Sequence, residues 1–190
     1  MDKTYYYKEV FMNEDFTGDH LDNIEFEDCR FDNCNFAGMS LIQTVFDNCV
    51  FNHCNCSLAA CMKTAFRDVT FNGCKLTGMQ LENAHTIGLQ VRFNNCLLNQ
   101  VNAYKVNLKA TTFTDCEMVE ADFSDAVLEQ AKFINCNLNQ TVFNNTNLQK
   151  ADFSTAHNFV INPTTNKLRQ AIFDKSNLEG LLVSFNIIFK

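Results

Sequence analysis

Ten cysteines and four histidines are the side chains of this 190-residue chain with the most reactive chemistry. Six of the cysteines follow one another at intervals of 20 residues, with a single interval of 22: Cys34, Cys54, Cys74, Cys96, Cys116 and Cys136. Regularly spaced thiols could form disulfides or hold a metal ion. The histidines, at positions 20, 53, 85 and 157, stand in different sequence contexts and lack the spacing of a metal site or a catalytic triad.

The regular spacing of the cysteines favours a filling role in a repetitive interior. On stacked strands, successive cysteines would lie about 4.8 Å apart at Cα, within bridging range, but their side chains would point in parallel. Free cysteine behaves as a small hydrophobe. The chain also contains neither a P-loop nor a Gly-rich dinucleotide fingerprint. We therefore expect reduced, buried thiols, no metal, no cofactor and no catalytic activity.

The elements that position these thiols are predicted by a five-residue period. Every fifth residue over 11–81 is Phe or Leu at thirteen of fifteen positions, the exceptions being Cys56 and Cys61. The phase then slips by two residues, and the positions over 93–153 are Phe, Leu or Met except Ala103. A small residue, Cys, Thr or Ala, stands two places before most of the large ones. Residues two apart in an extended segment share a face, so each pentapeptide is predicted to form one side of a coil.

A longer period gives the number of sides. Phenylalanine recurs every 20 residues, again with one step of 22, and this series is the predicted core ladder: Phe31, Phe51, Phe71, Phe93, Phe113, Phe133, Phe153 and Phe173. Four pentapeptides therefore close one coil, and one coil contains two extra residues near 84–92. About eight coils at the strand spacing would make a rod on the order of 40 Å long. We expect a single solenoid domain over 1–190, with coils over 11–173.

Both ends of the predicted rod depart from the repeat, as expected of caps that protect open strand edges. Residues 1–10 contain three consecutive tyrosines, Tyr5, Tyr6 and Tyr7, which predict an irregular covering strand. Near the other end, Pro163 takes a position where Phe or Leu is expected, so a loop is predicted over 157–165.

Residues 174–190 are predicted to form the second cap. Leu178, Leu181, Leu182 and Phe185 have helical spacing, and Ser176 with Glu179 has the pattern of a capping box. A short helix followed by a strand over 186–189 is the preferred interpretation. The alternative is that 176–180 is one more pentapeptide.

Two segments, Ala121-Asp122-Phe123-Ser124-Asp125 and Ala151-Asp152-Phe153-Ser154-Thr155, resemble the consensus of the pentapeptide-repeat family. The resemblance covers 11–178 and implies an all-β fold, the right-handed quadrilateral β-helix; the handedness rests on the resemblance alone. In the antibiotic-resistance branch of this family, a C-terminal helix and strand join two chains. The resemblance thus implies a homodimer, with this candidate interface: Leu178, Leu181, Leu182, Phe185, Ile187 and Phe189.

The insertion supplies the first candidate partner surface. The stretch Ile87-Gly88-Leu89-Gln90-Val91-Arg92-Phe93 is similar to one in quinolone-resistance (Qnr) proteins, in some of which loops near this level matter for protecting DNA gyrase. The candidate contact residues are Ile87, Gly88, Gln90 and Arg92. Because only two residues are added, the insertion is either a correction of the lattice or a bulge that contacts a partner.

The distribution of charge supplies a second candidate surface. The net charge is -7, and residues 1–60 carry eleven acids against three Lys or Arg. A later stretch without basic residues holds Asp115, Glu117, Glu120, Asp122, Asp125 and Glu129. B-DNA carries one charge per about 1.7 Å, several-fold denser than this rod, so imitation of DNA would depend on local patches. Ordinary solubilising charge is the alternative. Direct binding to nucleic acid or to membranes is not expected.

Two functions remain open. The resemblance to Qnr proteins implies a non-catalytic protein that imitates DNA, engages DNA gyrase or topoisomerase IV and protects it from quinolones or related poisons. The alternative is an interaction scaffold without a topoisomerase link, since fold does not decide function. Residues 1–10 lack the apolar core of a signal peptide, and the apolar tail 181–189 is too short to span a bilayer, so a cytoplasmic location is expected.

Overall fold

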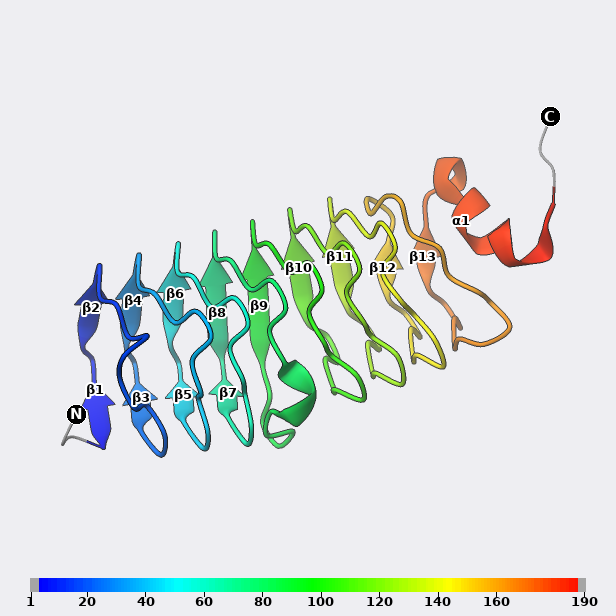
Figure 1. Ribbon diagram of the computed structural model, residues 1–190. Helices are drawn as coiled ribbons and strands as arrows, with labels where there is room; N and C mark the ends of the chain where they lie inside the picture. Colours follow the sequence, from blue (N-terminus) through cyan, green and yellow to red (C-terminus); the bar gives the residue numbers. More distant parts are fainter. Residues whose placement is uncertain (1–3, 188–190) are drawn as a thin grey trace.

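The computed structural model describes residues 4–187 as one rod of stacked four-sided coils (Figure 1). One side is a nine-stranded parallel sheet, here called the long sheet, in the order β13-β12-β11-β10-β9-β8-β6-β4-β2. Its strands are β2 (Val10–Met12), β4 (Arg30–Asp32), β6 (Val50–Asn52), β8 (Val69–Asn72), β9 (Val91–Asn94), β10 (Thr112–Thr114), β11 (Lys132–Ile134), β12 (Asp152–Phe153) and β13 (Ile172–Phe173). The chain is thus an all-β solenoid of about eight turns, as the five-residue period predicted.

The other three sides are less regular. The short sheet has the order β1-β3-β5-β7, with strands β1 (Tyr5–Tyr7), β3 (Glu25–Glu27), β5 (Val45–Asp47) and β7 (Ala65–Arg67). The third side is a column of single parallel bridges running from Asp15 to His157, and the fourth is a similar column from Ser40 to Val142. Each residue of a side therefore lies next to its equivalents in the coils before and after it.

The strand register follows the 20-residue period. Phe31 pairs with Phe51, and Phe113 pairs with Phe133. Between β8 and β9 the step is 22, since Phe71 pairs with Phe93. The insertion is therefore accommodated within a single coil. That coil contains the 3-10 turn η1 (Leu81–Asn83). The last strand of the short sheet, β7, belongs to the coil before it.

A left-handed residue turns the chain at almost every corner. Asp28, Asn33 and Asn48 have φ values of 54°, 55° and 52°, and Gly38 has a φ of 66°. Asn, Asp and Gly tolerate this region better than other residues, which explains their frequency at this position of the repeat. The corner also contributes to coil stacking, because its N–H donates to the next coil. The N–H of Asn48, for example, donates to the carbonyl of Arg67 at 2.8 Å.

The predicted core ladder is confirmed. Phe31, Phe113 and Phe133 are buried, and the rings stack nearly parallel from coil to coil, with centroids 4.6 Å apart for Phe31 and Phe51 and 5.3 Å for Phe93 and Phe113. Phe173, the last member, is only partly buried because the regular coils end there. Offset or parallel aromatic stacking adds to the apolar burial that stabilises the rod.

The N-terminal segment differs from the irregular covering strand that was predicted. Tyr5–Tyr7 is a regular strand, and Tyr6 pairs with Phe26 in register. The ring of Tyr6 stacks on that of Phe26 at 5.1 Å, so the lattice begins one pentapeptide before Phe11. Tyrosine fits this position because its ring is large enough to continue the aromatic stack.

The last coil keeps its shape although it lacks the large residues of the regular repeat, because other residues fill its interior. In the predicted loop over 157–165, His157 still bridges Asn137, and Phe159 and Ile161 are buried. A turn is confined to residues 163–165. Asn166 is buried there; its side chain accepts from the N–H of Thr146 at 2.8 Å and donates to the carbonyl of Phe143 at 2.9 Å.

The predicted C-terminal helix is present as a short helical cap (Figure 1). It comprises η2 (Lys175–Asn177), α1 (Glu179–Leu182) and η3 (Val183–Phe185). The predicted capping box is wrong: Asp174 is the cap, and its side chain accepts from the N–H of Ser176 at 2.8 Å. The strand predicted over 186–189 is not seen at Asn186 or Ile187, and the rest of it lies outside the described residues. No helix within residues 4–187 is long and apolar enough to cross a membrane.

Gly180 fixes the close approach of α1 to the last coil. A Cβ at this position would lie 2.1 Å from the carbonyl oxygen of Phe159, which is backbone and cannot move aside easily. We expect Gly180→Ala to lower the free energy of unfolding by about 1–3 kcal/mol, the usual cost of overpacking, and to detach the cap. Gly18→Ala is the matched control, since nothing lies within 4 Å of a Cβ there. Urea denaturation of both variants measures the difference, and equal midpoints would contradict this packing.

Candidate partner-binding surfaces

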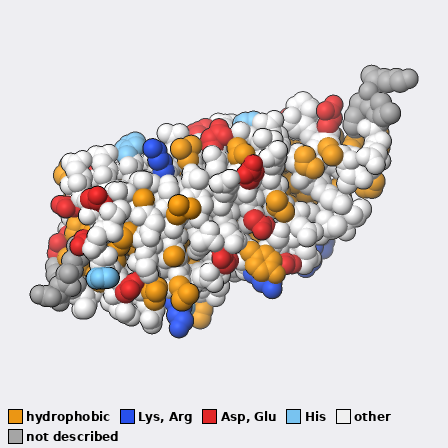
Figure 2. All heavy atoms as spheres, in the orientation of Figure 1, with side chains coloured by type: hydrophobic (Ala, Val, Ile, Leu, Met, Phe, Trp, Pro, Cys, Tyr) orange, Lys and Arg blue, Asp and Glu red, His pale blue; other side chains and the backbone are white. Residues whose placement is uncertain are grey.

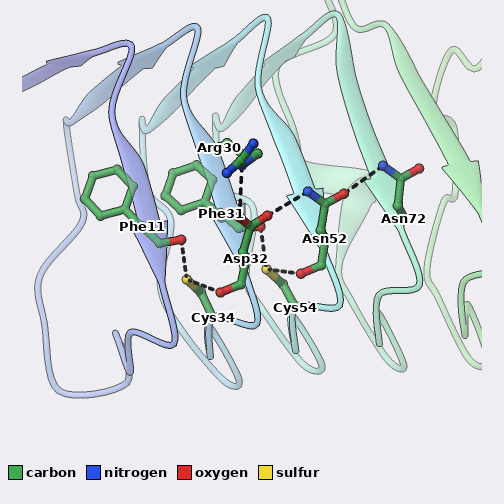
Figure 3. A network of polar contacts seen from close by, with 8 residues as sticks. All are labelled: Phe11, Arg30, Phe31, Asp32, Cys34, Asn52, Cys54 and Asn72. Atoms are coloured by element: carbon green, nitrogen blue, oxygen red, sulfur yellow. Dashed lines mark hydrogen bonds and ion pairs between the residues drawn. The ribbon is translucent and has the colours of Figure 1, made fainter.

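Outward side chains on the rod form ordered columns. In the column that Figure 3 shows, Asn52 donates to Asp32 at 2.7 Å, and Asn72 donates to Asn52 at 2.9 Å. Arg30, two residues before Asp32 on the same strand, forms an ion pair with Asp32 at 2.9 Å. Such columns hold surface groups in fixed positions before any partner arrives, which reduces the ordering cost of binding.

The acidic stretch predicted as a partner surface does not form one patch. Asp115 is the corner after β10, Glu117 is on the third side, and Asp122 is on the fourth. Glu120 and Asp125 are the corners on either side of Asp122, and Glu129 follows Val127 on the side in line with the short sheet. The six acids therefore form a partial ring over three of the four sides of one coil, and none of them lies on the long sheet. On the face that Figure 2 shows, acidic side chains are scattered along the rod.

Several acids of this ring are already engaged by neighbouring coils. Asn137 donates to Glu117 at 2.8 Å, and Gln100 donates to Glu120 at 2.9 Å. Lys109 forms an ion pair with Glu129 at 3.1 Å. These contacts are solvent-exposed and contribute little stability.

The insertion keeps its four predicted contact residues together. Ile87 is 77% exposed, and Gly88 has a φ of 75°, which favours glycine at this turn. The backbone N–H of Gln90 donates to the carbonyl of Phe66 at 3.0 Å, and Arg92 forms an ion pair with Asp68 at 2.6 Å. The insertion thus rejoins the lattice and also presents an exposed apolar side chain beside a shallow pocket. That pocket is lined by Gln90, Val91, Arg92, Lys109, Ala110, Thr111 and Thr112.

A more compact acidic surface lies near the N-terminal end, on the short sheet. It consists of Glu25, Glu27, Asp28 and Asp47, here called the acidic face. Glu27 pairs with Asp47 on the next strand, and Asp28 is the corner that follows Glu27. The sequence interpretation counted these acids among the eleven of residues 1–60 but did not group them. Applying the 20-residue register to outward positions as well as to core positions would have placed Glu27 beside Asp47.

Two exposed tyrosines border the acidic face. The rings of Tyr5 and Tyr7 are 6.4 Å apart and nearly parallel, and the hydroxyl of Tyr5 donates to the carboxylate of Glu27. A shallow groove beside them is lined by Thr4, Tyr5, Asn23, Ile24, Glu25, Gln43 and Val45. Exposed tyrosine next to fixed charge is typical of protein-binding surfaces.

The Tyr5 hydroxyl should titrate unusually late. Its hydrogen bond to Glu27 raises the pKa of Tyr5 from 10.0 to about 12. Because the folded-state pKa is raised, the stabilisation is fully present below about pH 10 and is lost as the pH rises through 12. Glu27→Gln should return the Tyr5 pKa toward 10, measured by tyrosinate absorbance during alkaline titration, whereas Glu117→Gln should not. An unchanged titration in Glu27→Gln would contradict the contact.

The cysteines are buried inside the rod and away from these surfaces. All ten are free thiols. Burial raises the pKa of Cys34 to about 11 and that of Cys49 to about 12, which disfavours the nucleophilic thiolate. Within residues 4–187, no group of three or more His, Cys, Asp or Glu is arranged to hold a metal ion.

A repeating coil with outward columns and a stacked aromatic core defines a class of solenoid protein. The family model described as "Pentapeptide repeat region" matches residues 44–123, 86–154 and 111–182. A second family model, "Pentapeptide repeats (8 copies)", matches residues 20–60. Together these matches cover most of the chain, which belongs to the pentapeptide-repeat family. No curated protein matches it.

Solved structures share the fold at low identity. Full-length QnrB1, a plasmid-mediated fluoroquinolone resistance protein, is 15% identical with a TM-score of 0.54; the alignment covers 96% of this chain and 100% of QnrB1. A trypsin-treated QnrB1 variant has a TM-score of 0.55 at 15% identity and covers 98% and 100%. HetL, a pentapeptide-repeat protein involved in heterocyst differentiation regulation in the cyanobacterium Nostoc sp., is 18% identical with a TM-score of 0.59 and covers 99% and 94%. These similarities show the solenoid fold.

Proposed function

We propose that this chain is a non-catalytic binding protein that engages DNA gyrase or topoisomerase IV in place of DNA and protects it from quinolones or related poisons. The observation that carries the proposal is the similarity to QnrB1, a fluoroquinolone resistance protein, over the whole length of both chains. A rod of this kind offers a partner its outer surface.

The acidic face is the part of the surface that best suits an enzyme groove built for DNA. Its four carboxylates lie on adjacent strands and corners, in fixed register, at the end of the chain where acids outnumber bases by eleven to three. Asn48 holds Asp28 through a hydrogen bond of 2.6 Å, and Tyr5 holds Glu27. Asp47 also forms an exposed ion pair with Arg67 at 3.5 Å, so the other three carboxylates are the positioned charges that would steer a basic partner and set its orientation.

The insertion is proposed as a second contact. Ile87 is the most exposed large apolar side chain of the described residues, and Arg92, Gln90 and Gly88 lie beside it. The bulge and the acidic face lie along the same side of the rod, since the insertion occupies the coil after β7, the last strand of the short sheet. A partner that follows this side would meet both.

A competition assay tests this surface. Fluorescent duplex DNA bound to gyrase would be displaced by the purified chain and by two charge-matched variants. The first, Glu25→Gln/Glu27→Gln/Asp28→Asn/Asp47→Asn, removes the acidic face; the second, Glu117→Gln/Glu120→Gln/Asp122→Asn/Asp125→Asn, removes four acids of the ring. We expect the first variant to compete about tenfold less well and the second to compete as the parent does. Equal weakening would show that net charge acts instead of the acidic face.

An interaction scaffold without a topoisomerase link is the second candidate. It is favoured by the similarity to HetL, a pentapeptide-repeat protein involved in heterocyst differentiation regulation. The TM-score of HetL, 0.59, exceeds the 0.55 of the trypsin-treated QnrB1 variant. Under this alternative neither variant would compete with DNA, and the parent chain would leave the gyrase–DNA complex intact.

A further inference from the structure

Six thiols occupy equivalent positions in successive coils and form a column inside the rod. Each sulfhydryl donates to the carbonyl of a phenylalanine on the long sheet in the preceding coil, for example from Cys54 to Phe31 at 3.3 Å and from Cys136 to Phe113 at 3.4 Å. Figure 3 shows Cys34 and Cys54 projecting in the same direction from adjacent coils. The sulfur atoms therefore repeat at the coil spacing of about 4.8 Å.

One sulfur of the column also accepts a hydrogen bond. The backbone N–H of Cys54 donates to the sulfur of Cys74 at 3.4 Å. A hydrogen bond of this kind stabilises a thiolate at the accepting sulfur.

This arrangement opposes a disulfide but suits a linear metal bridge. A disulfide needs sulfurs about 2.05 Å apart with side chains turned about 90° from one another, whereas stacked cysteines are parallel and too distant. Metal–thiolate bonds are about 2.3 Å long, so a linear sulfur–metal–sulfur unit spans about 4.6 Å, close to the coil spacing. The side chains point inward, across the axis of the rod, and an ion between two stacked sulfurs would lie along that axis. Each sulfur–metal bond would therefore be nearly perpendicular to the carbon–sulfur bond of the same cysteine.

We propose that the cysteine column is a two-coordinate thiolate site for a soft thiophilic ion, with Hg2+ as the best fit. Two thiols lose two protons and bind one Hg2+, and the product is neutral, so no net charge is buried. Zn2+ is excluded because it requires four ligands, and the described residues offer no group of three or more. One ion per pair gives about three ions for the six thiols.

Cys29 and Cys49 form a second, shorter column with the same geometry. The thiol of Cys49 donates to the carbonyl of Phe26 at 3.3 Å, and that of Cys29 to the carbonyl of Tyr6 at 3.5 Å. This pair adds one ion, for a total of about four per chain. Cys56 and Cys61 replace large residues of the central series and belong to neither column.

Native mass spectrometry after overnight incubation of the reduced full chain with Hg2+ tests the site. The double variant Cys74→Ser/Cys116→Ser interrupts the long column and should retain about two of about four ions. Serine is a suitable replacement because threonines at equivalent positions donate to the same kind of carbonyl, as Thr44 does to Leu21 at 2.6 Å. The control Cys56→Ala/Cys61→Ala removes the same number of thiols and should retain about four. Zn2+ should not bind to any of the three proteins.

X-ray absorption should show two sulfurs at about 2.3 Å around each mercury, with circular dichroism unchanged. The proposal is overturned by equal loss of mercury in both double variants, by three or four sulfurs per ion, by uptake that requires unfolding, or by no uptake at all.

Discussion

Replacing Phe113 with Ala should lower the free energy of unfolding by about 3–5 kcal/mol, the largest stability change that we expect from one substitution in this chain. The Phe113 ring is 1% exposed and lies between the rings of Phe93 and Phe133, at centroid distances of 5.3 and 5.1 Å. Its removal leaves a cavity that both adjacent coils border. Because coils contact only their neighbours, the rod has no other core to compensate.

Ile134→Ala is the matched control for this change. Ile134 belongs to the adjacent strand β11 but faces outward and is 37% exposed. Its truncation should change the free energy of unfolding by less than about 0.5 kcal/mol. Urea denaturation followed by circular dichroism measures both. If Phe113→Ala and Ile134→Ala unfold at the same midpoint, the stacked ladder does not stabilise the rod.

The second large effect concerns assembly. The parent chain should form a homodimer, and the variant Phe185→Asp/Ile187→Asp should be a monomer. The predicted interface is divided in the structure: Leu181 packs against the core, whereas Leu178, Phe185 and Ile187 are exposed. Phe185 and Ile187 are 50% and 52% exposed, so the cap does not consume its apolar surface within one chain. We propose that a second copy covers these residues, giving a rod of roughly 80 Å with the acidic faces outermost. Phe189, also predicted in the interface, lies outside the described residues.

Light scattering at tens of micromolar protein distinguishes the two states. The parent chain should have the mass of two chains, and Phe185→Asp/Ile187→Asp the mass of one, with an unchanged circular dichroism spectrum. Leu58→Asp/Ile134→Asp introduces the same charges at exposed positions elsewhere and should remain dimeric. A monomeric parent chain would reject the interface.

The fold could be predicted from sequence because one physical rule repeats in it. Ladder members such as Phe93 and Cys96 recur at a fixed interval, and burying them in register leaves only one way to stack the coils. The same rule located the two-residue insertion, since Phe71 and Phe93 differ by 22. The C-terminal helical cap followed from the apolar spacing of Leu178, Leu181 and Leu182.

The candidate surfaces were harder to predict because outward side chains are constrained less than inward ones. Asp115 and Glu129 are close in sequence, yet the chain turns around the rod between them. Glu27 and Asp47 are far apart in sequence, yet they pair directly. Local details also depend on competition between similar groups: Asp174 caps the helical segment where Ser176 was expected to, because the Asp174 carboxylate reaches the N–H of Ser176.

DNA supercoiling tests the proposed protection of a type II topoisomerase by this chain. Purified gyrase would supercoil relaxed plasmid in the presence of ciprofloxacin, with increasing amounts of the chain, of the acidic-face variant Glu25→Gln/Glu27→Gln/Asp28→Asn/Asp47→Asn and of its charge-matched control. We expect that the parent chain and the control, at micromolar concentration, restore supercoiling and that the acidic-face variant restores it poorly. If the parent chain neither restores supercoiling in the presence of the drug nor inhibits it without the drug, the proposed function is wrong.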